Sequence, residues 1–319
     1  MNASTPTILE VRDLKKAFAV RRGFLQRTGG AIRAVDGVDL EIRSNQTLGL
    51  VGESGCGKST VARLILRLLL PDSGLIRFEG REITGLDERE FKPLRKRMQM
   101  IFQDPYSSLN PRMTVAQSIV EGVRMAGIKS KADQRRRVEQ LLDMVGMPKA
   151  SADRYPHEFS GGQRQRVGIA RALSVAPQLI LCDEPISALD VSIQAQIINL
   201  LKDLQRDLGL SYLFISHDLN VVSYICDYVC VMYRGRIMES APAKVLFESA
   251  RHPYTLKLLA AIPGSKETVP ADPPIGQKKS VPAAGCAFFD QCLEGNEKCL
   301  ERPPALLEVA PEHFVRCWG

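Results

Sequence analysis

Apolar residues early in the chain form a short continuous run and then a helically spaced set. Residues 47–51 (Thr-Leu-Gly-Leu-Val) predict a short buried strand. A glycine-rich turn follows, and the next apolar residues recur at the spacing of one helix face until Pro71 ends the pattern. These residues are Val61, Leu64, Ile65, Leu68 and Leu69. The pattern therefore predicts a strand, a turn and a helix in direct succession.

The rest of the chain reads as further strands and helices. Two strands, 8–18 and 34–42, are expected before residue 47, with a basic, Gly-rich surface loop at 20–33. Residues 179–182 are wholly apolar, as expected for a parallel strand that is buried on both faces. Other strands are predicted at 75–78, 98–102, 212–215, 229–233 and 236–239, and helices within 114–150, 160–175 and 197–208. Pro, Gly and Lys enrich residues 263–284, which marks a linker.

The turn between the first predicted strand and helix matches the P-loop pattern G-x-x-x-x-G-K-[ST] over residues 52–60. This arrangement points backbone N–H groups and the positive helix end at one place, where phosphate binds. Lys58 is expected to reach the β- and γ-phosphates, and the Ser59 hydroxyl to bind Mg²⁺. The predicted ligands of the nucleotide are Gly52, Ser54, Gly55, Cys56, Gly57, Lys58, Ser59 and Thr60. The alternative is a flexible Gly/Ser turn, but the flanking strand and helix favour a nucleoside triphosphate site.

Composition narrows the class of protein only slightly. The 319 residues suit two domains, or one large domain with an appendage. No apolar run approaches the ~20 residues that cross a bilayer, and no signal peptide is visible, so a cytosolic location is expected. The net charge of +7 is modest, and the basic clusters at 95–97 and 135–137 are typical of solvated helix faces rather than nucleic-acid sites.

Six motifs follow one another in an order that resembles the nucleotide-binding subunits of ABC transporters. Residues 52–60 resemble Walker A, and residues 179–184 resemble Walker B. Residues 159–163 resemble the signature motif, with Phe159 in place of the commoner Leu. Gln103 resembles the Q-loop residue, residues 187–190 the D-loop, and His217 the switch histidine. The resemblance covers essentially the whole chain and implies an ATPase.

The resemblance also implies roles for these residues. Asp183 is expected to hold Mg²⁺ and Glu184 to polarise the attacking water. His217 is expected to contact the γ-phosphate, and Gln103 to contact Mg²⁺ or water from a mobile loop. Phe18 falls where the family places an aromatic residue that stacks on adenine. Lys58, Gln103, Glu184 and His217 are thus the predicted catalytic residues.

The signature motif implies a dimer. In this family its serine and glycines complete the nucleotide site of a facing subunit, so that two ATP molecules are buried between two such domains. The residues that carry this role are Ser160, Gly161 and Gly162. Gln163 of the same motif and Asp190 of the D-loop are also predicted to bind nucleotide. The Gln103 loop and the helical insertion are expected to transmit the resulting motion to membrane subunits.

The subfamily is suggested by residues 102–111, by His252-Pro253-Tyr254-Thr255 and by a cysteine-rich tail. These resemble the ATP-binding subunits of bacterial dipeptide and oligopeptide importers. The resemblance implies a second, homologous ATPase as heterodimer partner, two permeases and an extracytoplasmic binding protein, with no nucleic-acid partner. It places the chain peripherally on the cytoplasmic face of the inner membrane. Close relatives handle nickel or glutathione, so these cargoes remain alternatives.

The tail carries Cys286, Cys292, Cys299 and Cys317 with the spacing C-x5-C-x6-C-x17-C. The close C-x2-C pairs of common zinc sites are missing from this spacing. The family's C-terminal segment implies a [4Fe–4S] cluster, for which four thiolates are the right number of ligands. In this chain Gln291 stands where many relatives carry Arg. Zinc or unligated thiols remain the alternatives.

The expected fold is an α/β P-loop (RecA-like) ABC ATPase core with an N-terminal antiparallel β subdomain, a helical subdomain and a small Cys-rich segment. The expected boundaries are 1–262 for the nucleotide-binding domain, with its helical subdomain at about 106–165, then 263–285 for the linker and 286–319 for the tail. The leading hypothesis is the ATPase of a peptide importer. A soluble ABC ATPase of DNA repair or translation is less favoured, because the chain has one cassette and no heptad run. A small-molecule P-loop kinase would leave the signature motif unexplained.

Overall fold

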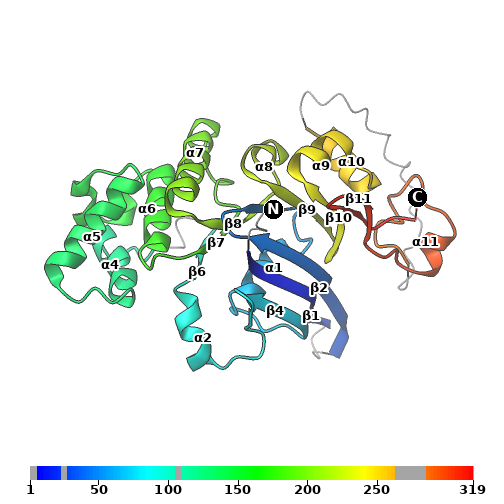
Figure 1. Cartoon of the computed structure of the whole chain (residues 1–319), viewed down its shortest axis with the longest axis horizontal. Helices are drawn as coiled ribbons and strands as arrows, with labels where there is room; N and C mark the ends of the chain where they lie inside the picture. The colour runs from blue at the N-terminus through cyan, green and yellow to red at the C-terminus, as the bar shows by residue number, and fades with distance from the viewer. Residues whose placement is uncertain (1–5, 23–26, 105–108, 263–284, 319) are drawn as a thin grey trace. The chain divides into compact units, whose positions relative to one another are not determined.

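The computed structural model describes residues 6–22, 27–104, 109–262 and 285–318. The described residues form two compact units, whose elements are labelled in Figure 1. We name the first the helical unit; it comprises residues 6–9, 42–47, 78–104 and 109–215. We name the second the P-loop unit; it comprises residues 10–22, 27–41, 48–77, 216–262 and 285–318.

Three parallel strands form the sheet of the helical unit: β6 (Met98–Ile101), β7 (Leu179–Asp183) and β8 (Ser211–Ser216). Strand β7 lies between the other two, with Leu179 opposite both Met98 and Ser211. Every residue of β7 is buried. The prediction of a parallel strand covered on both faces is therefore confirmed.

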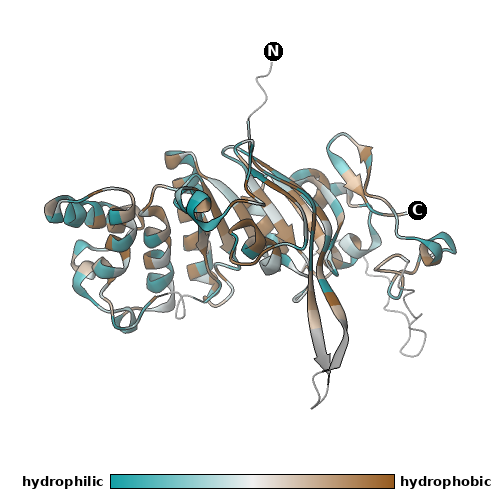
Figure 2. Cartoon of the chain, turned by 90° about the horizontal axis from the view of Figure 1, so that it is seen from below, coloured by the Kyte–Doolittle hydropathy of each residue, from teal (hydrophilic) through white to brown (hydrophobic). Residues whose placement is uncertain are grey.

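Two of the helices in this unit contact strand β6, and several form a bundle. The helices are α2 (Glu88–Arg95), α4 (Val115–Met125), α5 (Lys131–Met144), α6 (Gly161–Leu173) and α7 (Val191–Leu208), with short 3₁₀ helices at Lys149–Asp153 and Pro156–Glu158 and a two-residue strand β5 (Arg81–Glu82). Helices α4, α5 and α6 contact one another (Figure 1), and in Figure 2 each carries both hydrophobic and hydrophilic stretches. Val115, Ile119 and Val123 of α4 are buried together with Leu141 and Leu142 of α5. The helical insertion predicted at 114–150 is thus two amphipathic helices.

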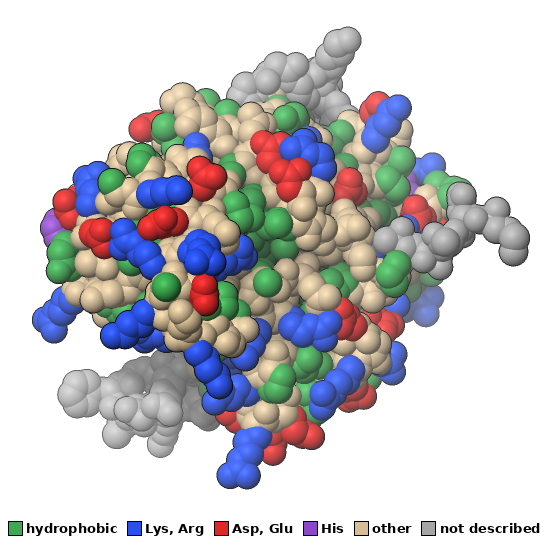
Figure 3. Space-filling model, turned by 60° about the vertical axis from the view of Figure 1, so that its left-hand side comes forward, with side chains coloured by type: hydrophobic (Ala, Val, Ile, Leu, Met, Phe, Trp, Pro, Cys, Tyr) green, Lys and Arg blue, Asp and Glu red, His purple; other side chains and the backbone are tan. Residues whose placement is uncertain are grey.

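The basic cluster at 135–137 lies on an exposed face of α5. Arg135 forms ion pairs with Asp153 and Glu139, and Arg136 pairs with Asp133. Figure 3 shows the same mixture of basic and acidic side chains on the side of the molecule that faces the viewer. A face of alternating charge suits solvation, as the sequence indicates, rather than binding to a phosphate backbone.

In the P-loop unit, β1 (Thr7–Arg22), β2 (Arg27–Arg43) and β4 (Ser73–Phe78) share one sheet in the order β2-β1-β4. The loop predicted at 20–33 is wrong over most of its length, because the described residues on either side of 23–26 belong to strands. Residues 23–26 lie outside the described part of the chain. The prediction followed the low β-propensity of glycine, but β1 and β2 pair through backbone hydrogen bonds, and this pairing makes the stretch a strand.

A second set of strands carries the P-loop and the C-terminal tail. Strand β3 (Thr47–Val51) runs parallel to β9 (Tyr228–Tyr233), which forms the expected hairpin with β10 (Arg236–Pro242). Beyond β10 lie β12 (His313–Val315) and β11 (Leu307–Ala310), both antiparallel to their neighbours. Both strands belong to the predicted Cys-rich segment, which therefore extends the sheet of the P-loop unit. The boundary at 286 stays a prediction, and residues 263–284 of the expected linker lie outside the described residues.

The helices of the P-loop unit are α1 (Lys58–Ile65), α8 (Leu219–Ile225), α9 (Ala243–Ser249), α10 (Pro253–Ala260) and α11 (Lys298–Glu301). Helix α1 is shorter than its apolar pattern predicts: Arg67 adopts a left-handed φ of 52°, and Leu68 is more than half exposed. Helices α9 and α10 pack against β10 (Figure 1). None of the helices in the described part of the chain has the length and apolarity that a bilayer crossing requires.

Candidate functional site

The P-loop has the predicted strand, turn and helix. Strand β3 is buried at all five residues, and α1 begins at Lys58 directly after the turn. Gly57 precedes the helix with a φ of 114°, without a side-chain capping bond, and the first turn holds no acidic residue. No side-chain cap therefore covers the positive end of α1. This end of a helix stabilises an anionic ligand.

Two glycines of the turn are required by close backbone contacts. A Cβ atom on Gly52 would lie 2.1 Å from the carbonyl oxygen of Met232, and one on Gly57 would lie 2.1 Å from that of Ala34. Both glycines also have positive φ angles, 148° and 114°. Any side chain at these positions would displace the turn from the adjacent strands.

Lys58 is buried, and its ammonium group is held by the loop itself. Nζ donates to the carbonyl oxygens of Gly52 (2.7 Å) and Glu53 (2.9 Å), and it lies 3.7 Å from the Sγ atom of Cys56. Burial raises the pKa of the Cys56 thiol, so that thiol stays protonated beside the lysine. The loop therefore keeps a cation next to the open end of α1, as phosphate binding requires.

The remaining predicted ligands of this unit are at least partly accessible. Ser54 and Gly55 are exposed, and Ser59 and Thr60 are half-buried in the first turn of α1. His217 is exposed directly after β8. Phe18 of β1 is 40% exposed, with Lys16 Nζ 5.9 Å from its ring centre. An exposed ring is available for stacking, so its adenine role stays a prediction.

In the helical unit, Asp183 and Glu184 follow one another at the end of β7, and Asp183 is buried. Glu184 has a left-handed φ of 48°, which is uncommon for a residue with a side chain. Its N–H donates to Ile215 (3.0 Å), and its carbonyl oxygen accepts from the hydroxyl of Ser187 (3.1 Å). These bonds hold the strained residue in place, and such strain is concentrated at functional sites.

Gln103 and Glu184 are in direct contact, which the sequence did not predict. Nε2 of Gln103 donates to Oε2 of Glu184 at 2.9 Å. The Q-loop residue therefore orients the carboxylate that is expected to act on water. Gln103 belongs to the segment 102–111 that suggested the subfamily, and residues 105–108 of that segment lie outside the described residues.

The signature motif begins helix α6 with Ser160 as its N-cap. Ser160 Oγ accepts from the N–H of Gln163 (3.3 Å), and Gln163 Oε1 accepts from the N–H of Ser160 (3.1 Å). This capping box uses the Gln163 side chain within the motif. A Cβ atom on Gly162 would lie 2.4 Å from Cγ2 of Ile193, so this glycine lets α6 approach α7 closely. Asp190 precedes α7 without a side-chain capping bond.

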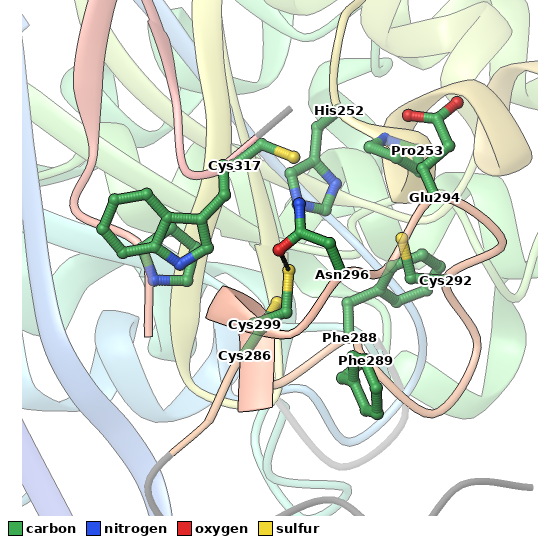
Figure 4. A pocket seen from close by; sticks show the side chains of 12 residues that line it. His252, Pro253, Cys286, Phe288, Phe289, Cys292, Glu294, Asn296, Cys299 and Cys317 are labelled. Atoms are coloured by element: carbon green, nitrogen blue, oxygen red, sulfur yellow. Dashed lines mark hydrogen bonds between the residues drawn. The ribbon is translucent and has the colours of Figure 1, made fainter. Parts of the chain in front are cut away.

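The four tail cysteines line one cavity of the P-loop unit, together with His252, aromatic residues and Asn296 (Figure 4). Asn296 lies among them, and its Oδ1 atom is 3.5 Å from Cys299 Sγ. Burial raises the pKa of Cys286 and raises that of Cys292 to about 11, and the neighbouring cysteines contribute further to both. Within the described residues, however, no three His, Cys, Asp or Glu side chains are arranged to hold a metal ion. The four predicted ligands therefore line one cavity, but the structure gives no support for the cluster itself.

Comparison with known proteins agrees with this geometry. The model of the ABC transporter family matches residues 35–187, and that of the oligopeptide/dipeptide transporter C-terminal region matches residues 238–299. The oligopeptide transport ATP-binding proteins OppF and AppF of Bacillus subtilis (strain 168) are 53% and 46% identical to this chain. The alignments cover 98% and 99% of this chain and 97% and 98% of those relatives. The chain belongs to the oligopeptide/dipeptide family of ABC transporter ATP-binding proteins.

Solved structures support the fold of this ABC ATPase. A dimeric, post-hydrolysis form of the ATP-binding cassette MJ0796 bound to ADP and phosphate matches with a TM-score of 0.66 and 28% identity. The alignment covers 74% of this chain and 98% of the MJ0796 chain. CbiO1 of Clostridium perfringens, part of an ABC transporter complex, also matches with a TM-score of 0.66 and 28% identity, over 76% of this chain and 92% of its own. The chain is thus an ATP-hydrolysing subunit of an ABC transporter.

One residue near the P-loop of this ABC ATPase was missed by reasoning from sequence. Tyr254 is fully buried, and its hydroxyl accepts a hydrogen bond from the N–H of Glu53 at 3.0 Å. The sequence offered it only as part of a subfamily segment. Its position 201 residues from Glu53 leaves no local signal of the contact.

Proposed function

We propose that this ABC ATPase powers the import of short peptides across the bacterial inner membrane. The observation that carries the proposal is the presence, in one chain, of an ABC cassette and an oligopeptide/dipeptide transporter C-terminal region. The C-terminal region is built into the P-loop unit, since it begins within β10, which pairs with β9. The subunit lies peripherally on the cytoplasmic face, and a homologous ATPase, two permeases and an extracytoplasmic peptide-binding protein complete the importer.

The nucleotide is held and hydrolysed by the motif residues. Lys58 neutralises the β- and γ-phosphates, and the N–H groups at the start of α1 bind their oxygens. Ser59 and Asp183 would hold Mg²⁺, which would supply positive charge against the negative charge that develops on the transferred phosphoryl group. Phosphoryl transfer is accelerated by such positioning and neutralisation rather than by covalent chemistry.

Glu184 acts as the base that polarises water, and Gln103 directs it. The 2.9 Å contact between their side chains supports this pairing. His217 contacts the γ-phosphate, and Phe18 stacks on adenine. The nucleotide site of the facing subunit is completed by the signature motif and the D-loop, through Ser160, Gly161, Gly162, Gln163 and Asp190.

Peptide uptake in cells that lack the chromosomal copy of this gene tests the function. Cells that express the intact chain should accumulate a radiolabelled tripeptide, and cells that express Glu184→Gln should not. Uptake of a single amino acid through other carriers is the matched control. Loss of nickel or glutathione uptake, with peptide uptake intact, would contradict peptide cargo.

Purification of the tagged chain from native membranes tests the partners. Two multi-span permeases, a second ATPase and a peptide-binding protein should copurify in mild detergent. Recovery of ribosomes or nucleic acid instead would favour the soluble class of ABC ATPase.

We further propose that the four tail cysteines bind a [4Fe–4S] cluster. Four thiols around one cavity suit this group in number and kind. The pKa values of Cys286 and Cys292 are raised by burial and by the neighbouring cysteines, and a bound cation would reverse that balance by stabilising the thiolates. Binding requires the Asn296 side chain to leave the space among them. Anaerobically purified protein should be brown and absorb near ~400 nm; colourless protein with one zinc per chain would contradict the cluster.

A further inference from the structure

Two hydrogen bonds hold one peptide group at the base of the P-loop. The carbonyl oxygen of Gly52 accepts from Lys58 Nζ at 2.7 Å, and the N–H of Glu53 donates to the Tyr254 hydroxyl at 3.0 Å. These two atoms belong to the same planar peptide group and point in opposite directions. The orientation of the carbonyl that holds Lys58 is therefore coupled to the hydroxyl of Tyr254.

Gly52 makes this coupling necessary. The residue has a φ of 148°, a conformation that other residues rarely adopt, and it has no side chain to restrict rotation of the following peptide. Lys58 is bonded to the carbonyl oxygens on both sides of Glu53. A fixed Gly52–Glu53 peptide thus keeps the lysine ammonium in one place before the nucleotide arrives.

Tyr254 is itself rigidly placed. It is fully buried in the first turn of α10, and its N–H donates to Nδ1 of His252 at 3.0 Å. Its ring centre lies 4.6 Å from that of Tyr233 and 5.4 Å from that of Phe288. Flipping the ring about its own axis does not move the hydroxyl, so the neighbouring rings fix the position of the acceptor oxygen.

Phe288 brings the Cys-rich segment into this arrangement. It is buried, lines the cysteine cavity and contacts the rings of Tyr233 and Tyr254. The segment is anchored beside it, because Gln291 donates to the Tyr233 hydroxyl at 3.0 Å and Arg234 pairs with Asp290 at 2.9 Å. A continuous set of contacts therefore joins the cysteine cavity to the P-loop within one unit.

We propose that Tyr254 is a positioning residue for nucleotide binding, which orients Lys58 through the Gly52–Glu53 peptide, and that Phe288 of the Cys-rich segment holds Tyr254 in place. The proposal rests on the assignment of the P-loop as the nucleotide site. It gives the C-terminal region a role in the affinity for ATP. Tyr254 contacts no reacting atom and acts through Lys58, which is expected to bind the phosphates in the ground state and in the transition state alike; its loss should therefore weaken both equally, which raises KM and retains kcat.

The test compares Tyr254→Phe with Tyr233→Phe in the full chain. Both changes remove one hydroxyl from the same aromatic cluster, but only Tyr254 accepts a bond from the P-loop. Titration with Mg²⁺ and a fluorescent N-methylanthraniloyl-ATP should give a dissociation constant about three- to tenfold higher for Tyr254→Phe. Tyr233→Phe should bind within about twofold of the unaltered chain. In the assembled transporter, Tyr254→Phe should raise KM for ATP by the same factor with kcat retained.

The outcomes separate the possible failures. If the unaltered chain does not bind the probe, the nucleotide site itself is wrongly assigned. If the unaltered chain binds and Tyr254→Phe binds equally well, or if both tyrosine variants weaken binding equally, the positioning role is refuted. Phe288→Leu provides a second measurement that does not depend on the folding of Tyr254→Phe. It should raise the dissociation constant by at least about twofold, and unchanged binding would refute the contribution of the Cys-rich segment.

Discussion

Replacement of Glu239 by glutamine should destabilise the P-loop unit far more than a surface substitution does. Glu239 lies on β10 and is completely buried. Oε1 accepts from the N–H of Arg251 (2.7 Å) and lies 2.7 Å from His313 Nε2, and Oε2 accepts from the N–H of His252 (3.0 Å). A carboxylate only accepts hydrogen bonds, so His313 donates through Nε2. The side chain therefore ties the start of α10 to both β10 and β12.

The cost of the change follows from these three bonds. An amide has one acceptor oxygen, so in either orientation its NH₂ group faces at least one of the buried donors. A hydrogen bond to a charged group contributes about 1.5–3 kcal/mol, and an unsatisfied buried donor costs a similar amount. We expect Glu239→Gln to lower the free energy of unfolding by at least about 1.5–3 kcal/mol.

The single tryptophan of the chain, Trp318, reports on this unit. Its ring lies 4.9 Å from the Arg302 guanidinium, and its Nε1 donates to the Arg302 carbonyl at 3.3 Å. Urea unfolding followed by its fluorescence should show the loss. Glu248→Gln, at an exposed position of α9, is the matched control and should change the free energy by no more than about 0.5 kcal/mol. Equal unfolding curves for the two variants would refute the reasoning.

Three further predictions concern the two units. Glu184→Gln should retain ATP binding and lower phosphate release by the assembled transporter about 10²-fold or more; full turnover would exclude Glu184 as the base. Gly162→Ala should lower the free energy of unfolding by about 1–3 kcal/mol, because its Cβ meets Ile193. Gly168→Ala, in the same helix with open space, should be neutral or stabilising by circular dichroism, and equal losses would contradict this. Because the pKa of Cys292 is raised to about 11, its alkylation by iodoacetamide in metal-free protein should accelerate about tenfold from pH 9 to pH 10; a rise of only about twofold, as for a thiol with the ordinary pKa of 9.0, would contradict the shift.

Strands and motif positions were predictable because they depend on local patterns. The apolar run at 179–182 indicated a buried parallel strand, and β7 is buried along its whole length. A helix was predicted within residues 160–175, and α6 begins there behind the capping box that Ser160 forms with Gln163. The start of α6 depends on residues that are close in sequence. The burial of β7 follows from its continuous apolar pattern.

Element ends were less predictable. The pattern of α1 continued to Leu69, but the helix ends at Ile65 because Arg67 adopts a left-handed conformation. The Gly-rich stretch at 27–33 forms part of β2 because β1 lies beside it and pairs with it. Pairing partners and packing neighbours override local propensity at such places.

By itself, the sequence determined the chemistry of this protein. An ABC ATPase is identified by three motifs in their order: the P-loop, the signature motif and Asp183-Glu184. Each motif is recognisable because the groups within it that bind phosphate or metal stand at short, fixed spacings. The tertiary structure alone decided which of the distant groups meet. The bond from Gln103 to Glu184, the assembly of four cysteines on one cavity and the bond from Glu53 to Tyr254 join residues 6 to 201 positions apart. Such contacts depend on how buried strands and helices stack, and no local pattern of apolar and polar residues encodes that arrangement.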